Sequence, residues 1–373
     1  MLKSETQIVQ LFSERNPFIL QSGKKLDHVQ VAFETYGQLN ERRDNGILIC
    51  HALTGDAHAA GITQVSEALL QKIPFYAHKK PQQLGWWDGL IGPGKALNTE
   101  RYFVVCPNIL GSCYGTTGPA SLRPGTQKPY GPEFPVISVR DMVRVQKVLT
   151  DYLGLKRLHA VIGGSLGGMM TLEWGIMYPD FMKALIPIAA PVAHSAWAIG
   201  FNHLARQAIM TDPDWNGGYY QKQPQKGLAL ARQIAMISYR THPSFQERFG
   251  RLLQPEAADG RFQVESYLSY QGQKLVRRFD ANSMILLTKA MDAHDVGKGR
   301  GGIEAALKTI KAQTLSIGID TDILYPTDEQ KEIARLVPKA RYDEIHSLNG
   351  HDAFLIEYDQ LNAMIGEFLK GIK

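Results

Sequence analysis

The chain has 373 residues, of which 44% are hydrophobic and 21% charged, and its formal net charge is +5 at pH 7. This composition excludes a disordered chain, and the small positive excess is scattered rather than massed, which argues against nucleic-acid binding. The three cysteines form no C-x-x-C pair, no apolar run reaches membrane-spanning length, and the first residues lack an apolar core, so we expect a cytoplasmic protein with no membrane partner.

In the first half of the chain, short apolar runs alternate with amphipathic stretches. Between two of these runs, residues 139–153 carry apolar side chains at helical spacing, with Ser138 as the N-cap and Gly154 as the stop signal. This succession predicts an α/β fold with a mostly parallel sheet covered by helices. The expected strands are 29–36, 46–53, 102–109, 158–163, 184–190 and 314–319.

The pattern changes near Pro191. From there to about residue 300 the sequence favours helical segments, such as 227–239 and 281–291, separated by loops that contain Pro and Gly. Strand character returns only at Thr314. We therefore expect a core domain made of residues 1–190 and 301–373, with residues 191–300 inserted as a helical lid.

The most informative segment is an apolar run that ends in Gly163-Gly164-Ser165-Leu166-Gly167, directly before a helix-forming stretch. This strand, turn and helix context is typical of a nucleophile elbow, in which glycines let the backbones approach while a serine is held at the tip. We expect the Ser165 hydroxyl to act as a nucleophile. The backbone N–H of Leu166 is then placed to donate to a developing oxyanion.

A serine hydroxyl is a poor nucleophile at neutral pH, so the elbow predicts a carboxylate after a later strand and a histidine near the C-terminus. His351, in a glycine-bearing loop before a final amphipathic helix, fits the general base. Two acids compete for the carboxylate. Asp320 ends its strand, whereas Asp322 lies two residues further into the loop, where it can curl back to the histidine. Chemistry alone hardly separates them, and we choose Asp322.

A second oxyanion donor is expected from the loop after an early strand, and we assign it to the backbone N–H of Leu53. His51 and His58 have no third ligand at a suitable spacing, so we expect no metal. Residues 89–96 nearly spell a phosphate-binding loop, but Ala96 stands where Ser or Thr must hold magnesium, and the required strand does not precede it. Nucleotide hydrolysis is therefore excluded.

Several longer segments of the sequence form a recognisable set. They are HALTGDAHA (51–59), GWWDGLIGPGKALNT (85–99), NILGSCYGTTGP (108–119), GGSLGGM (163–169), FNHLARQAI (201–209) and GHDAFLIEYD (350–359). Together these segments resemble one family, the homoserine O-acyltransferases of the α/β-hydrolase superfamily, and most nearly its acetyl-using members. The resemblance runs from about Phe18 to Asp359. In two places the sequence departs from the family pattern: Asn349 replaces a usual tyrosine and Asn98 a usual aspartate.

The resemblance implies an α/β-hydrolase fold with a helical lid and the same serine, aspartate and histidine as above. It also implies substrate contacts from Arg232, Tyr239 and Asp352. These contacts make chemical sense, because free homoserine carries a carboxylate that suits a guanidinium and an ammonium that suits a carboxylate.

For the reaction, the resemblance implies acetyl-CoA as the acyl-donor substrate, L-homoserine as the acceptor, no bound cofactor, and a ping-pong transfer through an acyl-serine in methionine biosynthesis. It also suggests a homodimer that contacts through the helical insertion. Alternatives are succinyl-CoA as the donor or serine as the acceptor, a plain esterase or thioesterase with the same triad, and a binding module of the same fold without activity.

Overall fold

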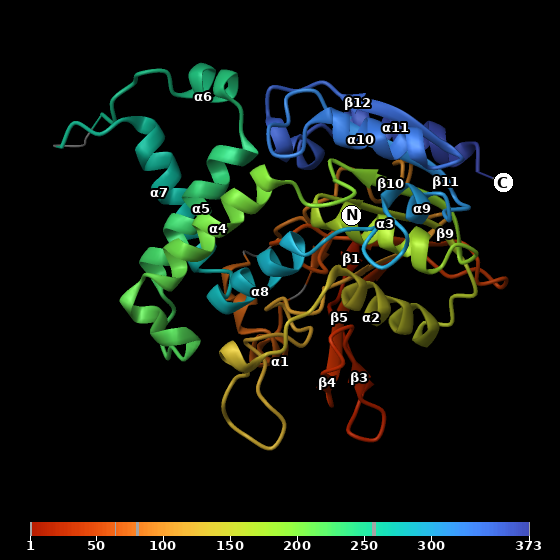
Figure 1. Cartoon of the computed structure of the whole chain (residues 1–373), viewed down its shortest axis with the longest axis horizontal. Helices are drawn as coiled ribbons and strands as arrows, with labels where there is room; N and C mark the ends of the chain where they lie inside the picture. The colour runs from red at the N-terminus through yellow and green to blue at the C-terminus, as the bar shows by residue number, and fades with distance from the viewer. Residues whose placement is uncertain (1, 64, 80–81, 256–258, 373) are drawn as a thin grey trace.

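The computed structural model describes residues 2–63, 65–79, 82–255 and 259–372 (Figure 1). Within these residues the chain builds one main sheet of eight strands in the order β12-β11-β10-β9-β6-β8-β5-β2. The strands from β12 to β8 are parallel, and β5 and β2 run antiparallel to their neighbours. Its strands are β2 (Gln7–Phe12), β5 (Val29–Tyr36), β6 (Gly46–Cys50), β8 (Phe103–Pro107), β9 (Leu158–Gly164), β10 (Met182–Ile188), β11 (Gln313–Ile319) and β12 (Ala340–Ile345).

All six predicted strands are present, with ends that differ by at most three residues from the expectation. The two strands of this main sheet that were not predicted, β2 and β12, form its two edges. Their residues are mostly half-buried or exposed, so neither strand carries the continuous apolar run that marks a central parallel strand.

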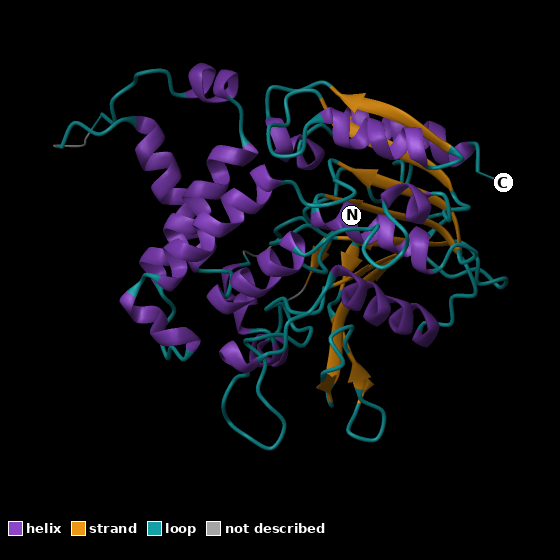
Figure 2. Ribbon diagram, in the orientation of Figure 1, coloured by secondary structure: helices purple, strands orange, loops and turns teal. Residues whose placement is uncertain are grey.

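Helices cover both faces of this sheet (Figure 2). Strand β6 shows how the two faces are filled, because successive residues of a strand point to opposite sides. Ile47 and Ile49 pack in one buried cluster with apolar residues of α11, whereas Leu48 and Cys50 pack in the other with apolar residues of α2 and α3. The core helices are α1 (Glu67–Lys72), α2 (Val139–Tyr152), α3 (Leu166–Met177), α10 (Thr327–Leu336) and α11 (Tyr358–Lys370).

Between β10 and β11 the chain leaves the sheet and forms a run of helices. Helix α5 packs against both α4 and α7, and the group stands beside the sheet rather than over one face (Figure 1). These helices are α4 (Ala196–Met210), α5 (Gln225–Tyr239), α6 (His242–Arg248), α7 (Gln263–Val276) and α8 (Ala281–Asp292), followed by α9 (Ile303–Leu307).

The remaining elements are short. Two small strand pairs, β1 with β7 and β3 with β4, lie outside the main sheet. Their bounds, with those of the 3₁₀ helices, are β1 (Lys3–Ser4), β3 (Phe18–Ile19), β4 (Lys25–Leu26), β7 (Ile62–Thr63), η1 (Pro74–His78), η2 (Gly131–Glu133), η3 (Pro213–Gly218) and η4 (Gly350–Leu355).

A buried carboxylate holds α3 in place. Glu173 on α3 is 1% exposed and forms ion pairs with Arg140 of α2, at 3.0 Å, and with Arg300 of the loop after α8, at 2.7 Å. Two cations around one buried carboxylate compensate its desolvation, and removal of one partner from such a group is strongly destabilising. Because α3 begins directly after Ser165, this group also fixes the position of the serine.

Candidate active site

Ser165 occupies the sharp turn between β9 and α3. Its backbone has φ 59° and ψ −124°, a conformation that a residue with a Cβ rarely adopts. The turn brings α3 so close to β6 that a Cβ on Gly167 would lie 2.0 Å from the carbonyl oxygen of Cys50, and one on Gly163 would lie 2.5 Å from it. Only glycine fits these two positions, which explains the sequence of the elbow.

His351 and Asp322 form a buried pair at the carboxyl end of the parallel strands, where Ser165 also lies. Nδ1 of His351 lies 2.7 Å from Oδ2 of Asp322. The other carboxylate oxygen, Oδ1, accepts hydrogen bonds from the backbone N–H groups of Leu324 at 2.8 Å and Tyr325 at 3.0 Å. With both oxygens engaged, the carboxylate has one orientation, and the Nδ1 proton of the imidazole faces it.

The second acid considered from the sequence has another partner. Asp320 is exposed, its carboxylate lies 3.1 Å from Nδ1 of His346, and it accepts a hydrogen bond from the backbone N–H of Ser347. The two residues between the end of β11 and Asp322 therefore decide which acid contacts His351.

Ser165 and His351 share their neighbours. Ser165 lines a pocket together with Tyr239 and Tyr325, whose rings lie 5.6 Å and 5.1 Å from the ring of His351. Ser165, Asp322 and His351 follow β9, β11 and β12, respectively. Since these strands are parallel, their carboxyl ends meet at one edge of the sheet, which brings the three residues to one region.

The electrostatics at this edge favour a histidine that accepts a proton. Burial alone disfavours the imidazolium, but the carboxylates of Asp322 and Asp352 outweigh it and raise the pKa of His351 above its ordinary value. A proton accepted by this ring is therefore stabilised by two nearby negative charges.

Two backbone N–H groups are free beside the serine. Within the described residues, neither Leu53 nor Leu166 donates its N–H to a protein acceptor. Leu53 lines the pocket with Ser165, and Leu166 begins α3. The loop that holds Leu53 is fixed by Arg278, which donates to the carbonyl oxygen of Thr54 at 2.7 Å and to its hydroxyl at 3.0 Å. Arg278 was not expected from the sequence.

The pocket above Ser165 is walled by α4, α5 and α8. Arg232 and Tyr239 of α5 both line it, and the guanidinium carbon of Arg232 lies 5.4 Å from the centre of the Tyr239 ring. Burial lowers the pKa of Arg232, against the opposing influence of Tyr239 and Asp352, and an arginine stays cationic under such a shift. The pocket therefore offers the partly buried positive charge of Arg232.

Asp352 lies next to His351 and already has a cationic partner. Its Oδ2 lies 3.2 Å from Nη2 of Arg240, which also donates to the side-chain oxygen of Asn349 at 2.8 Å. Neither contact was expected from the sequence. Asn349, which departs from the family pattern, therefore helps to hold Arg240 against Asp352.

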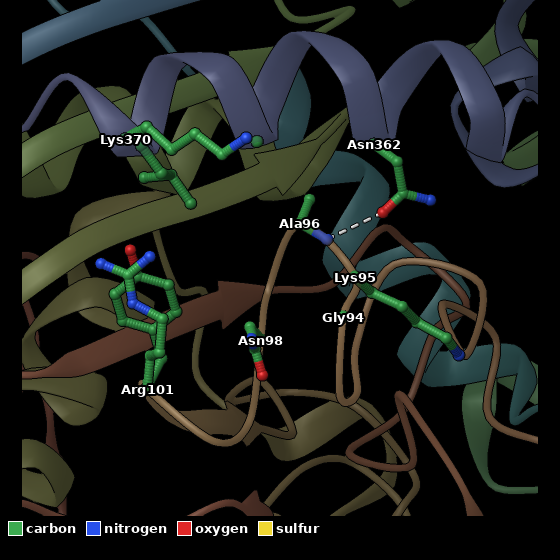
Figure 3. A pocket seen from close by; sticks show the side chains of 10 residues that line it. Gly94, Lys95, Ala96, Asn98, Arg101, Asn362 and Lys370 are labelled. Atoms are coloured by element: carbon green, nitrogen blue, oxygen red, sulfur yellow. Dashed lines mark hydrogen bonds between the residues drawn. The ribbon is translucent and has the colours of Figure 1, made fainter.

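A separate open pocket lies at the other end of the sheet, beside the residues that directly precede β8. It includes Gly94, Lys95 and Ala96 of the near phosphate-binding loop, together with Arg101 and Lys370 (Figure 3). The ammonium of Lys95 is held by the backbone carbonyl and the carboxylate of Asp88. The positive charge of Lys95 is therefore already paired within its own loop.

No helix in the part of the chain that the structure describes has the length and apolar character that crossing a bilayer requires. The His, Cys, Asp and Glu side chains of the same described residues form no group of three or more suited to a metal ion. All three cysteines are buried and free.

Comparison with known proteins places these features in context. The family profile described as alpha/beta hydrolase fold matches residues 46–358. A homoserine O-acetyltransferase of Moorella thermoacetica is 52% identical over 364 residues, which cover 95% of this chain and 94% of that protein. The crystal structure of homoserine O-acetyltransferase from Bacillus anthracis superimposes with a TM-score of 0.88 at 31% identity and covers 100% of both chains. That of esterase E22 superimposes with a TM-score of 0.86 at 28% identity over 98% of this chain and 100% of the other.

Proposed function

Because the chain belongs to the homoserine O-acetyltransferase family, with an α/β-hydrolase fold, we propose that it transfers the acetyl group of acetyl-CoA to the hydroxyl of L-homoserine in methionine biosynthesis. The observation that carries the proposal is the buried pair of His351 and Asp322 beside a serine in a strained elbow. In this proposal Ser165 is the nucleophile, His351 the general base, and Asp322 the group that orients the base.

The first half of the reaction forms an acyl-serine. The Ser165 hydroxyl attacks the thioester carbonyl while His351 takes its proton, and the N–H groups of Leu53 and Leu166 stabilise the oxyanion. The thiol of coenzyme A leaves with the proton from His351. In the second half the homoserine hydroxyl gives its proton to His351 and attacks the acyl-serine, which releases O-acetylhomoserine.

The acceptor is recognised by the polar groups around the pocket. Arg232 binds the carboxylate of homoserine, and Tyr239 packs beside that guanidinium. Asp352 attracts the ammonium group of homoserine, and its carboxylate also forms an ion pair with Arg240. The helices of residues 191–300 act as a lid that limits the entry of water, which favours transfer over hydrolysis of the acyl-serine.

A single assay tests donor and acceptor together. The purified protein is mixed with acetyl-CoA or succinyl-CoA and with L-homoserine or L-serine, while free thiol and product mass are monitored. We expect the fastest thiol release with acetyl-CoA and homoserine, and a product of the mass of O-acetylhomoserine. A preference for succinyl-CoA or for serine would replace the donor or the acceptor while leaving the serine mechanism intact.

Hydrolysis of simple esters is the second candidate function, which the similarity to esterase E22 favours. Arg232→Gln separates the two, because an esterase needs no group for an amino-acid carboxylate. For a transferase, KM for homoserine rises about 30- to 100-fold, as expected for loss of a charge-assisted hydrogen-bond pair, while acetyl-ester cleavage persists. Arg248→Gln, at an exposed arginine of α6, is the matched control. If homoserine-dependent thiol release survives unchanged in Arg232→Gln while ester hydrolysis falls, the transferase assignment is wrong.

We also propose that the protein acts in the cytoplasm as a homodimer. Three free buried cysteines suit a reducing compartment. Exposed apolar side chains occur one heptad apart on α4, at Trp197 and Leu204, and on α5, at Leu230 and Ile237, so each pair lies on one side of its helix. Light scattering tests the proposal: a monomeric mass would contradict it, and Leu230→Glu should weaken the dimer.

A further inference from the structure

Tyr325 touches both members of the buried pair. Its backbone N–H donates to Oδ1 of Asp322 at 3.0 Å, and its ring meets the ring of His351 edge-on, with centroids 5.1 Å apart and planes at 76°. The side chain is 0% exposed. The imidazole therefore has one carboxylate at Nδ1 and one fixed aromatic wall, and the orientation of that wall limits the orientation of the base.

The hydroxyl of Tyr325 has a dedicated partner outside the proposed triad. It lies 2.9 Å from Nε2 of His194, and Nδ1 of the same histidine lies 3.2 Å from Oδ1 of Asp292. A carboxylate accepts only, so Nδ1 of His194 carries the proton toward Asp292, and in the neutral ring Nε2 accepts from the tyrosine hydroxyl. Asp292, His194 and the Tyr325 hydroxyl thus form a second series of an aspartate, a histidine and a hydroxyl, next to the proposed triad.

Asp292, the last residue of α8, is in turn held by side chains of α4. Arg206 and Asn202, both on α4, contact its two oxygens at 2.7 Å and 2.8 Å. Burial opposes ionisation of this carboxyl, but the hydrogen bond from His194, together with Asn202 and Arg206, lowers its pKa below the ordinary value. Asp292 is therefore a fixed negative charge that keeps His194 in one tautomer.

From these contacts we infer that Tyr325 is a positioning residue for His351, held through His194 and Asp292 by the helices α4 and α8. The inference rests on the proposed function for the role of His351. A phenylalanine fills the same space, so a packing role alone does not require the hydroxyl. The hydroxyl belongs to a network with four further polar side chains, and burial of such a network is costly unless every member is satisfied. The network thus connects α4 and α8, which line the pocket, to the ring that packs against His351.

The test is Tyr325→Phe, which keeps the ring and removes only the hydroxyl. Tyr358→Phe is the matched control, because that hydroxyl also donates one hydrogen bond, to the carbonyl of Trp86 at 2.9 Å, but outside the network. The two half-reactions are measured separately: acylation by p-nitrophenyl acetate, and transfer from the acyl-serine to homoserine. Since His351 acts in both, we expect both rate constants to fall by the same factor, about 10-fold, with KM changed less than about 2-fold.

Asp292→Asn should lower both rates as well, and its combination with Tyr325→Phe should lower them no further than the more damaging single change, since the residues act as one unit. A fall confined to the homoserine step, with a raised KM for homoserine, would overturn the inference, as would rates equal to those of Tyr358→Phe. Acylation by p-nitrophenyl acetate needs neither coenzyme A nor homoserine, so a wrong donor or acceptor leaves this test intact. The downfield proton resonance of His351 Nδ1–H, which should shift in Tyr325→Phe and stay unchanged in Tyr358→Phe, gives a readout without turnover.

Discussion

The imidazole of His351 lies 2.7 Å from the carboxylate of Asp322, and both side chains are buried, with 3% and 5% of the residue surface exposed. Water therefore screens the pair only weakly, and the interaction stabilises the protonated ring more than the same contact at the surface would. In the proposed mechanism, this relationship determines how the activity responds to pH.

The pH dependence of the activity should report the charges around His351. The base must be neutral to accept the Ser165 proton, so kcat/KM rises with pH through the pKa of His351. Asp322 and Asp352 raise this pKa. Asp352→Asn removes one of the two stabilising charges, so the acidic limb of the profile for acetyl-ester cleavage should move to lower pH. Asp359→Asn, at an exposed position of α11, serves as the control and should leave the limb in place. A limb that moves upward would contradict this account.

The strained backbone of Ser165 predicts an unusual order of stabilities. Ser165→Ala and Ser165→Gly should both abolish acyl transfer, but glycine adopts φ 59° without strain, so the glycine variant should be about 1 kcal/mol more stable than the alanine variant. Urea unfolding of the two variants measures the difference. At Ser269, an exposed position inside α7, the same pair should show the opposite order, because alanine is the better helix former. Equal stabilities at position 165 would mean that the elbow stores no strain.

The sheet and its edge residues follow from local patterns, whereas the groups that fix them do not. Ser165 and His351 could be proposed from the sequence because each lies within a recognisable motif, at a strand end or before a helix, and parallel strands bring such ends together. The choice between Asp320 and Asp322 depends on the path of a two-residue turn, which periodicity does not describe. Arg278 holds Thr54 across 224 positions of sequence, and a contact over such a separation leaves no local pattern.

The contact of Arg278 with the loop of Leu53 makes a specific prediction for catalysis. Arg278→Gln removes the two hydrogen bonds to Thr54 and leaves the Leu53 amide less well placed for the oxyanion, so kcat should fall about 10- to 100-fold for every acyl donor, as when one oxyanion donor is impaired. Thr54→Val removes only the hydrogen bond to the hydroxyl and should give a smaller loss. Steady-state rates with acetyl-CoA and with p-nitrophenyl acetate measure both. An effect on homoserine KM alone would instead place Arg278 in acceptor binding.

Glu329, which lies close to Asp322 of the proposed triad, should make the stability of the protein depend on pH. Burial and the nearby charge of Asp322 raise the pKa of this carboxyl to about 7, and its Oε2 is buried without a hydrogen-bond partner among the described residues. Between its ordinary pKa of 4.5 and about 7, the folded protein keeps a proton that the unfolded chain has lost, so the free energy of unfolding falls as pH rises through this window. Above about pH 7 the loss of stability stays constant, on the order of 1 kcal/mol after allowance for solvent screening.

Glu329→Gln should therefore stabilise the protein at pH 8 and have little effect at pH 4.5. Asp328→Asn, at the exposed neighbour in the same turn of α10, corrects for the loss of one charge from that turn. Thermal unfolding at both pH values measures the difference, and a larger stabilisation at the lower pH would show that Glu329 is ionised without penalty.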